Sequence, residues 1–237
     1  MDDSTTAGPG PVAFCLASAS PSRRQVLAGA GLHPLARAAD LDEGALVRAA
    51  EAEQGRPLDL DGIVALLARA KAESVAPRLR AEGFRGLVLG CDSNFGLDGA
   101  SYGKPHTPER ARERWRAMSG RSGVLASGHW LIDLRGERGP FPAAGEVERS
   151  QLRFARVDDA EIERYVASGE PLEVAGGFTL EGRASAFIER IEGTPSGVMG
   201  VSVPVLRRLA ARLGVRWNRL VTPASSARTA PHTASAL

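Results

Sequence analysis

The chain has 237 residues, of which 43% are hydrophobic, enough to bury one sizeable core. Its 30 basic and 28 acidic residues nearly balance, which argues against a protein that coats nucleic acid. Because no uninterrupted apolar stretch approaches about 18 residues, we expect no spanning helix and no membrane partner.

The cysteine content and the first residues both favour a cytoplasmic protein. Cys15 and Cys91 are the only cysteines, too few for a disulfide framework and consistent with a reducing compartment. The opening MDDSTTAGPGP is acidic and lacks the apolar core of a signal peptide. Residues 1–11 and 222–237 are rich in small and polar residues, so we predict disordered tails around a single domain at 12–221.

An apolar strand at 12–17 runs directly into a turn that is rich in hydroxyl groups. Ser20 is the expected N-cap of the following helix, with Pro21 at its first position. The free backbone N–H groups of such a helix start favour an anion. Arg23 would add a guanidinium fork for phosphate oxygens. The alternative is an ordinary solvated or salt-bridged arginine.

Two further segments carry charges next to predicted helices. Asp40, Asp42 and Glu43 precede a helix at 45–53 and can either hold a divalent cation or cap the helix. Lys71 lies at the edge of the apolar stripe of a helix at 61–79. It either extends along the core to reach solvent or binds phosphate.

The stretch LVLGCDSNFGLDGASYGKP, at 87–105, combines a buried strand with a hairpin-like turn. Gly90 and Cys91 are small enough to let other backbone come close, and we expect Asp92 at the exit of the strand. The turn then returns Lys104 toward Asp92. A carboxylate for a metal and an ammonium for phosphate suit an anionic ligand that carries a divalent cation. The alternative is a strand, a turn and two solvated charges.

The rest of the chain alternates strands with helices, which predicts an α/β class. Strands are expected at 123–134, 151–157 and 186–191, with a loop at 136–145. Helices are expected after Thr107-Pro108, after the capping box of Asp158 and Glu161, and at 204–213. His129, in the first of these strands, is either a ligand or a structural residue.

The sequence lacks the P-loop, GxGxxG and HExxH signatures. It does contain, in one order, LASASPSRR, LDE, ARAKA, GCDS, GKP, SGR, YVASGEPLEVAGGFTLEG, FIERIEG and PSGVMGVSVP. In this order the segments, which span 13–215, resemble the Maf family of nucleoside triphosphate pyrophosphatases, also called septum formation inhibitors.

The resemblance implies a mixed-sheet α/β fold shared with inosine triphosphate pyrophosphatases, with a central cleft and a homodimeric assembly. It implies hydrolysis of a nucleoside triphosphate, canonical or modified, to the monophosphate and pyrophosphate with a divalent cation (Mg²⁺, Mn²⁺ or Co²⁺). It also implies a role in limiting the incorporation of non-canonical nucleotides and a link to arrest of cell division.

The same resemblance suggests a role for each matching residue. Asp92 would be the general base and, with Asp42, a metal ligand. The expected substrate-binding and phosphate-binding residues are Ser18, Ser20, Arg23, Lys71, Lys104 and Glu181.

Four positions depart from the family pattern: Ser93 stands where Thr is common and Gly197 where Asn is usual, and the other two bear directly on the substrate. Ser22 stands where many relatives have a first arginine, which leaves Arg23 to act alone or with Arg24. Glu181 stands where the branch acting on thymidine and uridine triphosphates has glutamine. Because a carboxylate only accepts hydrogen bonds, we hypothesise a base with adjacent donors, such as guanine or a modified guanine.

Two alternatives stay open. One is an inosine or xanthosine triphosphate pyrophosphatase. The other is a nucleotide-binding regulator of septum formation without significant catalysis.

Overall fold

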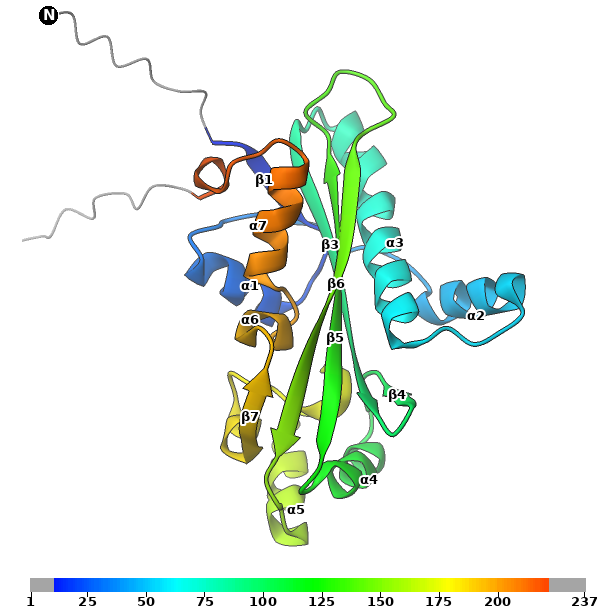
Figure 1. The fold of residues 1–237 in the computed structure, drawn as a ribbon, viewed down its shortest axis with the longest axis vertical. Helices are drawn as coiled ribbons and strands as arrows, with labels where there is room; N and C mark the ends of the chain where they lie inside the picture. The colour runs from blue at the N-terminus through cyan, green and yellow to red at the C-terminus, as the bar shows by residue number, and fades with distance from the viewer. Residues whose placement is uncertain (1–10, 222–237) are drawn as a thin grey trace, which may run out of the picture.

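The computed structural model describes residues 11–221, which form one seven-stranded mixed sheet flanked by helices (Figure 1). The strand order is β2-β1-β3-β5-β6-β7, with β4 paired to β3. The strands are β1 Ala13–Leu16, β2 Leu35–Ala36, β3 Gly86–Leu97, β4 Ala100–Tyr102, β5 Ser122–Asp133, β6 Ala143–Phe154 and β7 Ile188–Glu192. The predicted mixed-sheet α/β class is confirmed. Apart from Pro11, the tails predicted to be disordered lie outside the described residues.

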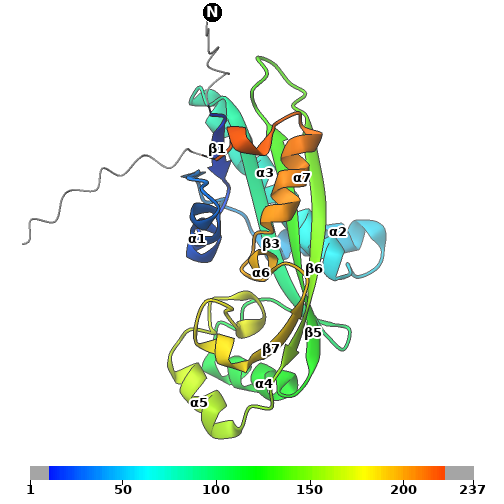
Figure 2. The same ribbon diagram turned by 60° about the vertical axis from the view of Figure 1, so that its left-hand side comes forward.

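The helices cover both faces of the sheet. They are α1 Pro21–Gly29, α2 Glu43–Gln54, α3 Leu60–Ala81, α4 Pro108–Met118, α5 Asp159–Ala167, α6 Pro195–Val198 and α7 Val203–Arg212, with 3-10 turns η1 Ala175–Gly177, η2 Arg183–Phe187 and η3 Trp217–Arg219. Along β3, Val88 packs with α3, while Leu87 and Leu89 pack with α1 and α7. This alternation follows from the period of two in a strand, so α3 covers one face and α1 with α7 the other (Figures 1 and 2).

Local capping signals place several helix starts as predicted. Ser20 caps α1, where its Oγ accepts from the Arg23 backbone N–H at 3.4 Å. Asp158 and Glu161 form the predicted capping box of α5. Asp42 caps α2 through its Oδ1, so this helix begins two residues earlier than expected. Each cap satisfies a backbone donor that the first helical turn leaves without a partner.

The long strands β3, β5 and β6 each have 12 residues, so each extends about 40 Å. One end of these strands packs with α1, α3 and α7, and the other with α4 and α5 (Figure 2). The second core is aromatic. Edge-to-face contacts link its rings, which belong to Phe95, Trp115, Phe154, Tyr165 and Phe178. The two ends thus have separate cores along one continuous sheet.

The prediction of a loop at 136–145 and a strand at 151–157 is wrong for part of this region. β6 begins at Ala143, because it pairs with β5 from Ile132↔Ala143 to Ser122↔Arg153. Gly145 lies inside this strand, opposite Trp130 of β5. The position needs glycine because a Cβ there would approach Trp130 Cε3 to 2.4 Å. A glycine under an aromatic ring weakens the local strand signal that the sequence carries.

The expectation that Asp92 lies at the exit of its strand is also wrong. β3 continues for five residues beyond Asp92, to Leu97, because β5 pairs with it continuously from Leu87 to Gly96. On its other edge β3 pairs with β1 only as far as Leu89 and with β4 only from Phe95. Within the described residues, positions 90–94 therefore have no strand partner on that edge. Asp92 lies in this gap.

Two glycines let α3 lie directly on the sheet. A Cβ at Gly90 would come within 2.0 Å of the Ala68 carbonyl oxygen, and one at Gly128 within 2.2 Å of the Val64 carbonyl oxygen. Real Cβ atoms do not approach backbone this closely, so the packing requires glycine at both positions. The predicted close backbone approach at Gly90 is confirmed, and it brings Lys71 of α3 against Asp92.

Candidate active site

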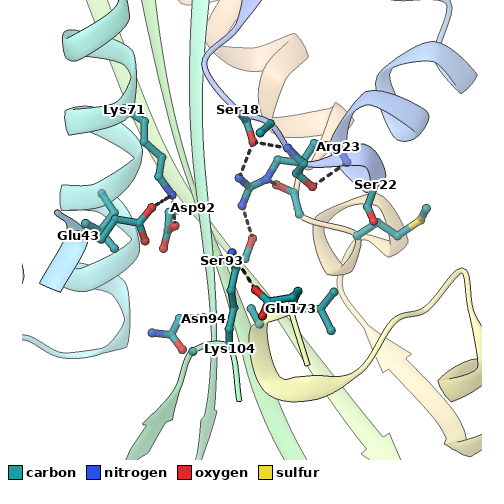
Figure 3. Close-up of a pocket in the computed structure, with 18 of the residues that line it drawn as sticks. Ser18, Ser22, Arg23, Glu43, Lys71, Asp92, Ser93, Asn94, Lys104 and Glu173 are labelled. Carbon is teal, nitrogen blue, oxygen red and sulfur yellow. Dashed lines mark hydrogen bonds and ion pairs between the residues drawn. The ribbon is translucent and has the colours of Figure 1, made fainter. Parts of the chain in front are cut away.

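A cleft of about 830 Å³ opens at the gap between β1 and β4 on the edge of β3 (Figure 3). Its walls come from the start of α1, the start of α2, α3, β3, the segment after β4, and the segment around η1. The structure brings all eight predicted site residues to this one cavity: Ser18, Ser20, Arg23, Asp42, Lys71, Asp92, Lys104 and Glu181. Residues predicted from scattered motifs thus share one cavity.

On one side of β3, Lys71 bridges two carboxylates (Figure 3). Its Nζ lies 2.6 Å from Asp92 Oδ1 and 2.8 Å from Glu43 Oε1. Asp92 is only 7% exposed, whereas Glu43 lies at the cleft surface. Lys71 therefore ends between two carboxylates inside the cleft and does not extend into open solvent.

Sequence reasoning missed Glu43 as a site residue. It lies in the LDE motif, and the sequence treats it only as one member of an acidic cluster. The available signal is its position directly after the cap of α2, which holds its side chain beside Lys71.

Burial dominates the electrostatics of Asp92. Removal from water raises the pKa of the Asp92 carboxyl above its ordinary value, while the charges of Lys71 and Arg23 oppose this rise. A raised pKa makes the carboxylate a stronger base. The neighbouring Cys91 faces the core on the side of α1 and α7, and burial raises the pKa of its thiol to about 12.

On the other side of β3, three acceptors hold the Arg23 guanidinium (Figure 3). Nε donates to the Gly200 carbonyl at 2.9 Å, Nη1 to Ser18 Oγ at 3.2 Å, and Nη2 to Ser93 Oγ at 3.3 Å. Arg24 is exposed and does not line the cleft. Of the two arginines in the SPSRR turn, therefore, only Arg23 faces the cavity.

The wall opposite α1 carries exposed charges. Lys104 Nζ lies 4.0 Å from Glu173 Oε2, and His106 Nδ1 lies 3.3 Å from Glu173 Oε1. Because these groups are solvent-exposed, their pairing is weak and a charged ligand can replace it.

Glu181 lines the cleft from the segment 179–183, which is held by hydrogen bonds to the carboxylate of Glu170. Glu170 accepts hydrogen bonds from Thr179 Oγ1 at 2.5 Å and from the Arg183 backbone N–H at 2.9 Å. Sequence reasoning did not assign Glu170 a role. The glycine turns expected in this region are present, with Gly176 and Gly177 at φ +72° and +78°.

The residues of the cleft fit a divalent cation that substrate oxygens help to hold. Within residues 11–221, no group of three or more His, Cys, Asp or Glu side chains is placed to hold a metal ion by itself. Asp42, Glu43 and Asp92 nevertheless supply hard carboxylate oxygens in one cavity. Mg²⁺ is commonly bound by one or two carboxylates together with phosphate oxygens and water.

His129 is a structural residue, as one of the two readings expected. It is 2% exposed, and its Nε2 accepts from the Ser202 backbone N–H at 2.8 Å. Burial lowers the pKa of its imidazole to about 4, so the ring is neutral at neutral pH.

In residues 11–221, no helix is long and apolar enough to cross a membrane.

Comparisons with known proteins agree with the motifs. A model of the family described as Maf-like protein matches residues 13–213. The chain is 53% identical over 205 residues to a protein of Leifsonia xyli subsp. xyli, covering 86% of this chain and 94% of that one. It is 47% identical over 201 residues to a protein of Nocardia farcinica, covering 84% and 92% of the two chains.

A third relative, from Thermosynechococcus vestitus, is 48% identical over 203 residues, which cover 86% of this chain and 94% of that protein. All three relatives carry the name nucleoside triphosphate pyrophosphatase. The family match and these identities extend over most of the chain, so the protein is a member of the Maf-like family.

Proposed function

We propose that this protein is a nucleoside triphosphate pyrophosphatase, which hydrolyses its substrate to a nucleoside monophosphate and pyrophosphate. The observation that carries the proposal is the convergence on one cleft of a buried carboxylate, Asp92, with Arg23, Lys71 and Lys104. The names of the relatives support it.

In the proposed reaction, Asp92 accepts a proton from the attacking water. The water oxygen forms a bond to the α-phosphorus, the bond between the α-phosphorus and the oxygen that bridges it to the β-phosphorus breaks, and pyrophosphate leaves with that oxygen and the electron pair. Burial raises the pKa of Asp92, which favours this proton transfer, while the ion pair with Lys71 keeps the carboxylate ionised and oriented.

The cations stabilise the charge that the phosphate groups carry in the transition state. A guanidinium has five N–H donors, and three donors of Arg23 are held by protein acceptors. The remaining donors are free to bind phosphate oxygens, and the backbone at the start of α1 adds to this anion site, where Ser18 and Ser20 lie. Lys104 approaches from the opposite wall. Positioning and charge stabilisation are the main demands of phosphoryl chemistry.

The proposed cofactor is a divalent cation, Mg²⁺, Mn²⁺ or Co²⁺. Asp92, Glu43 and Asp42 would hold it. When bound, it would neutralise phosphate charge and polarise the reacting phosphoryl group. Lys71, which contacts two of these carboxylates, would then be available to the substrate.

The first test removes the proposed base. We expect Asp92→Asn to lower turnover by about 10³-fold, measured as pyrophosphate release, while the circular dichroism spectrum is retained. Asp98→Asn is the matched control, because Asp98 belongs to the turn after the same strand, is exposed and does not line the cleft. Retained turnover in Asp92→Asn would remove Asp92 from the mechanism. A non-catalytic regulator would instead be favoured if the wild type bound nucleotide tightly but released no pyrophosphate with Mg²⁺, Mn²⁺ or Co²⁺.

The second test concerns the nucleobase of the substrate. Glu181 supplies only acceptors, so we propose a preference for a base with adjacent donors, such as guanine or a modified guanine. The measurement is kcat/KM across UTP, dTTP, GTP, methylated GTP, ITP and XTP. Glu181→Gln should move the preference toward UTP and dTTP. Best turnover of UTP or dTTP by the wild type, unchanged in Glu181→Gln, would contradict this assignment, and best turnover of ITP or XTP would favour the inosine and xanthosine alternative.

We further propose a cytoplasmic homodimer that has no nucleic-acid or membrane partner and limits incorporation of non-canonical nucleotides. Light scattering of the purified protein tests the dimer. A mutation-frequency assay in cells that lack the protein tests the cellular role, and the division phenotype of the same cells tests the link to septum formation.

A further inference from the structure

A buried serine lies behind the cleft wall that holds Arg23. Ser127, on β5, is 0% exposed and does not line the cleft, so it does not touch a ligand there. Its Oγ lies 2.8 Å from Ser93 Oγ on β3 and 2.8 Å from the carbonyl oxygen of Gly197 in α6. Ser93 in turn contacts Arg23 Nη2 at 3.3 Å. These contacts form a continuous chain from α6 to the guanidinium.

The chemistry of the two ends sets the direction of each hydrogen bond. The Gly197 carbonyl can only accept, so the single hydroxyl proton of Ser127 is donated to it. The Ser127 oxygen therefore accepts from the hydroxyl of Ser93. With its own proton used, Ser93 offers lone pairs to Arg23, whose guanidinium can only donate.

The same chain ties the turn around α6 to Arg23 at two points. The carbonyl of Gly200 accepts directly from Arg23 Nε, and the carbonyl of Gly197 is linked through the two serines. Gly200 lies close to the guanidinium, because a Cβ there would be 3.0 Å from Arg23 Nε. The plane of the guanidinium is thus held from two sides without any contribution from the ligand.

We propose that Ser127 is a positioning residue, which fixes the Arg23 guanidinium for phosphate by forcing Ser93 to act as an acceptor. This inference rests on the proposed function, in which Arg23 binds the triphosphate. Without Ser127, the Ser93 hydroxyl is free to rotate and donate elsewhere, and the Gly197 carbonyl keeps the Gly200 backbone N–H but loses its link to the two serines. A guanidinium that must be ordered on binding binds more weakly.

The test uses Ser127→Ala and measures binding of inorganic tripolyphosphate by calorimetry alongside steady-state kinetics. We expect about tenfold weaker tripolyphosphate binding and a similar rise in KM, with a smaller change in kcat. Ser119→Ala is the stability control, since Ser119 also loses two hydrogen bonds but lies outside the cleft.

A double-mutant cycle separates positioning from general damage. In an Arg23→Ala background, Ser127→Ala should weaken tripolyphosphate binding no further, because both changes act through one guanidinium. Full additivity, or a loss of activity with unchanged KM and tripolyphosphate affinity, would overturn the proposal. If Ser127→Ala does not fold, Ser127→Cys keeps the volume with a weaker donor and should show the same weakened binding. The binding readout does not need turnover, so an inactive wild type that binds tripolyphosphate through Arg23 would refute the proposed function and leave this inference standing.

Discussion

At the scale of single residues, the central feature is a carboxylate whose basicity depends on two opposing effects. Burial raises the pKa of Asp92, and the charge of Lys71 is the largest effect that lowers it. The base must be ionised to accept a proton, so activity falls as the pH decreases through the pKa of Asp92. The position of the acidic limb of the pH profile therefore reports this pair.

Lys71→Met removes the opposing charge. The pKa of Asp92 should then rise further, so we expect the acidic limb of log(kcat/KM) to move to higher pH, together with about a hundredfold loss of activity at its optimum. Lys71→Arg, which keeps the charge, should leave the limb close to its original position. An unmoved limb in Lys71→Met would show that a group other than Asp92 titrates there.

At the scale of elements, the site depends on how closely α3 lies on β3. The side chains that meet, Lys71 and Asp92, are 21 positions apart in the chain and come together because Gly90 has no Cβ. A Cβ at position 90 would collide with backbone atoms of Ala68 and Ala72 in α3. Such a clash cannot be relieved by a change of side-chain rotamer.

Gly90→Ala should push α3 away from the sheet. We expect a loss of about 3 kcal/mol in the free energy of unfolding, measured by urea denaturation, and a loss of activity in the fraction that stays folded. The matched control is Gly29→Ala at the end of α1, where a Cβ would meet nothing within 4 Å. That variant should be neutral or more stable by about 0.5 kcal/mol. Equal effects of the two substitutions would show that close packing of α3 is not required.

At the scale of the whole molecule, the cleft lies between the two cores. The segment 18–23 and α3 belong to one end of the long strands, while Lys104 and Glu181 belong to the end with the aromatic cluster. A ligand that contacts both walls therefore joins the two ends of the long strands across the cleft (Figure 2).

A nucleoside triphosphate with Mg²⁺ should stabilise both ends together. With Asp92→Asn used to prevent turnover, we expect a gain of about 2.7 kcal/mol when the ligand is present at about 100 times its Kd. Hydrogen exchange should slow at the start of α1 and also in the segment after β4. Protection of one wall alone would contradict a ligand that spans the cleft.

The sequence alone determined the features that depend on neighbouring residues. Ser20 and the pair Asp158 and Glu161 cap the helices as predicted, because capping involves residues only three positions apart. The ordered motifs also identified eight of the residues that line the cleft.

Only the tertiary structure decided how these residues face one another. The mid-strand position of Asp92, the ion pair of Glu43 with Lys71, and the contact of Ser93 with Ser127 all depend on strands and helices distant in the chain. No local periodicity records such contacts, because the pairing partner sets where a strand ends and which side chains meet across it.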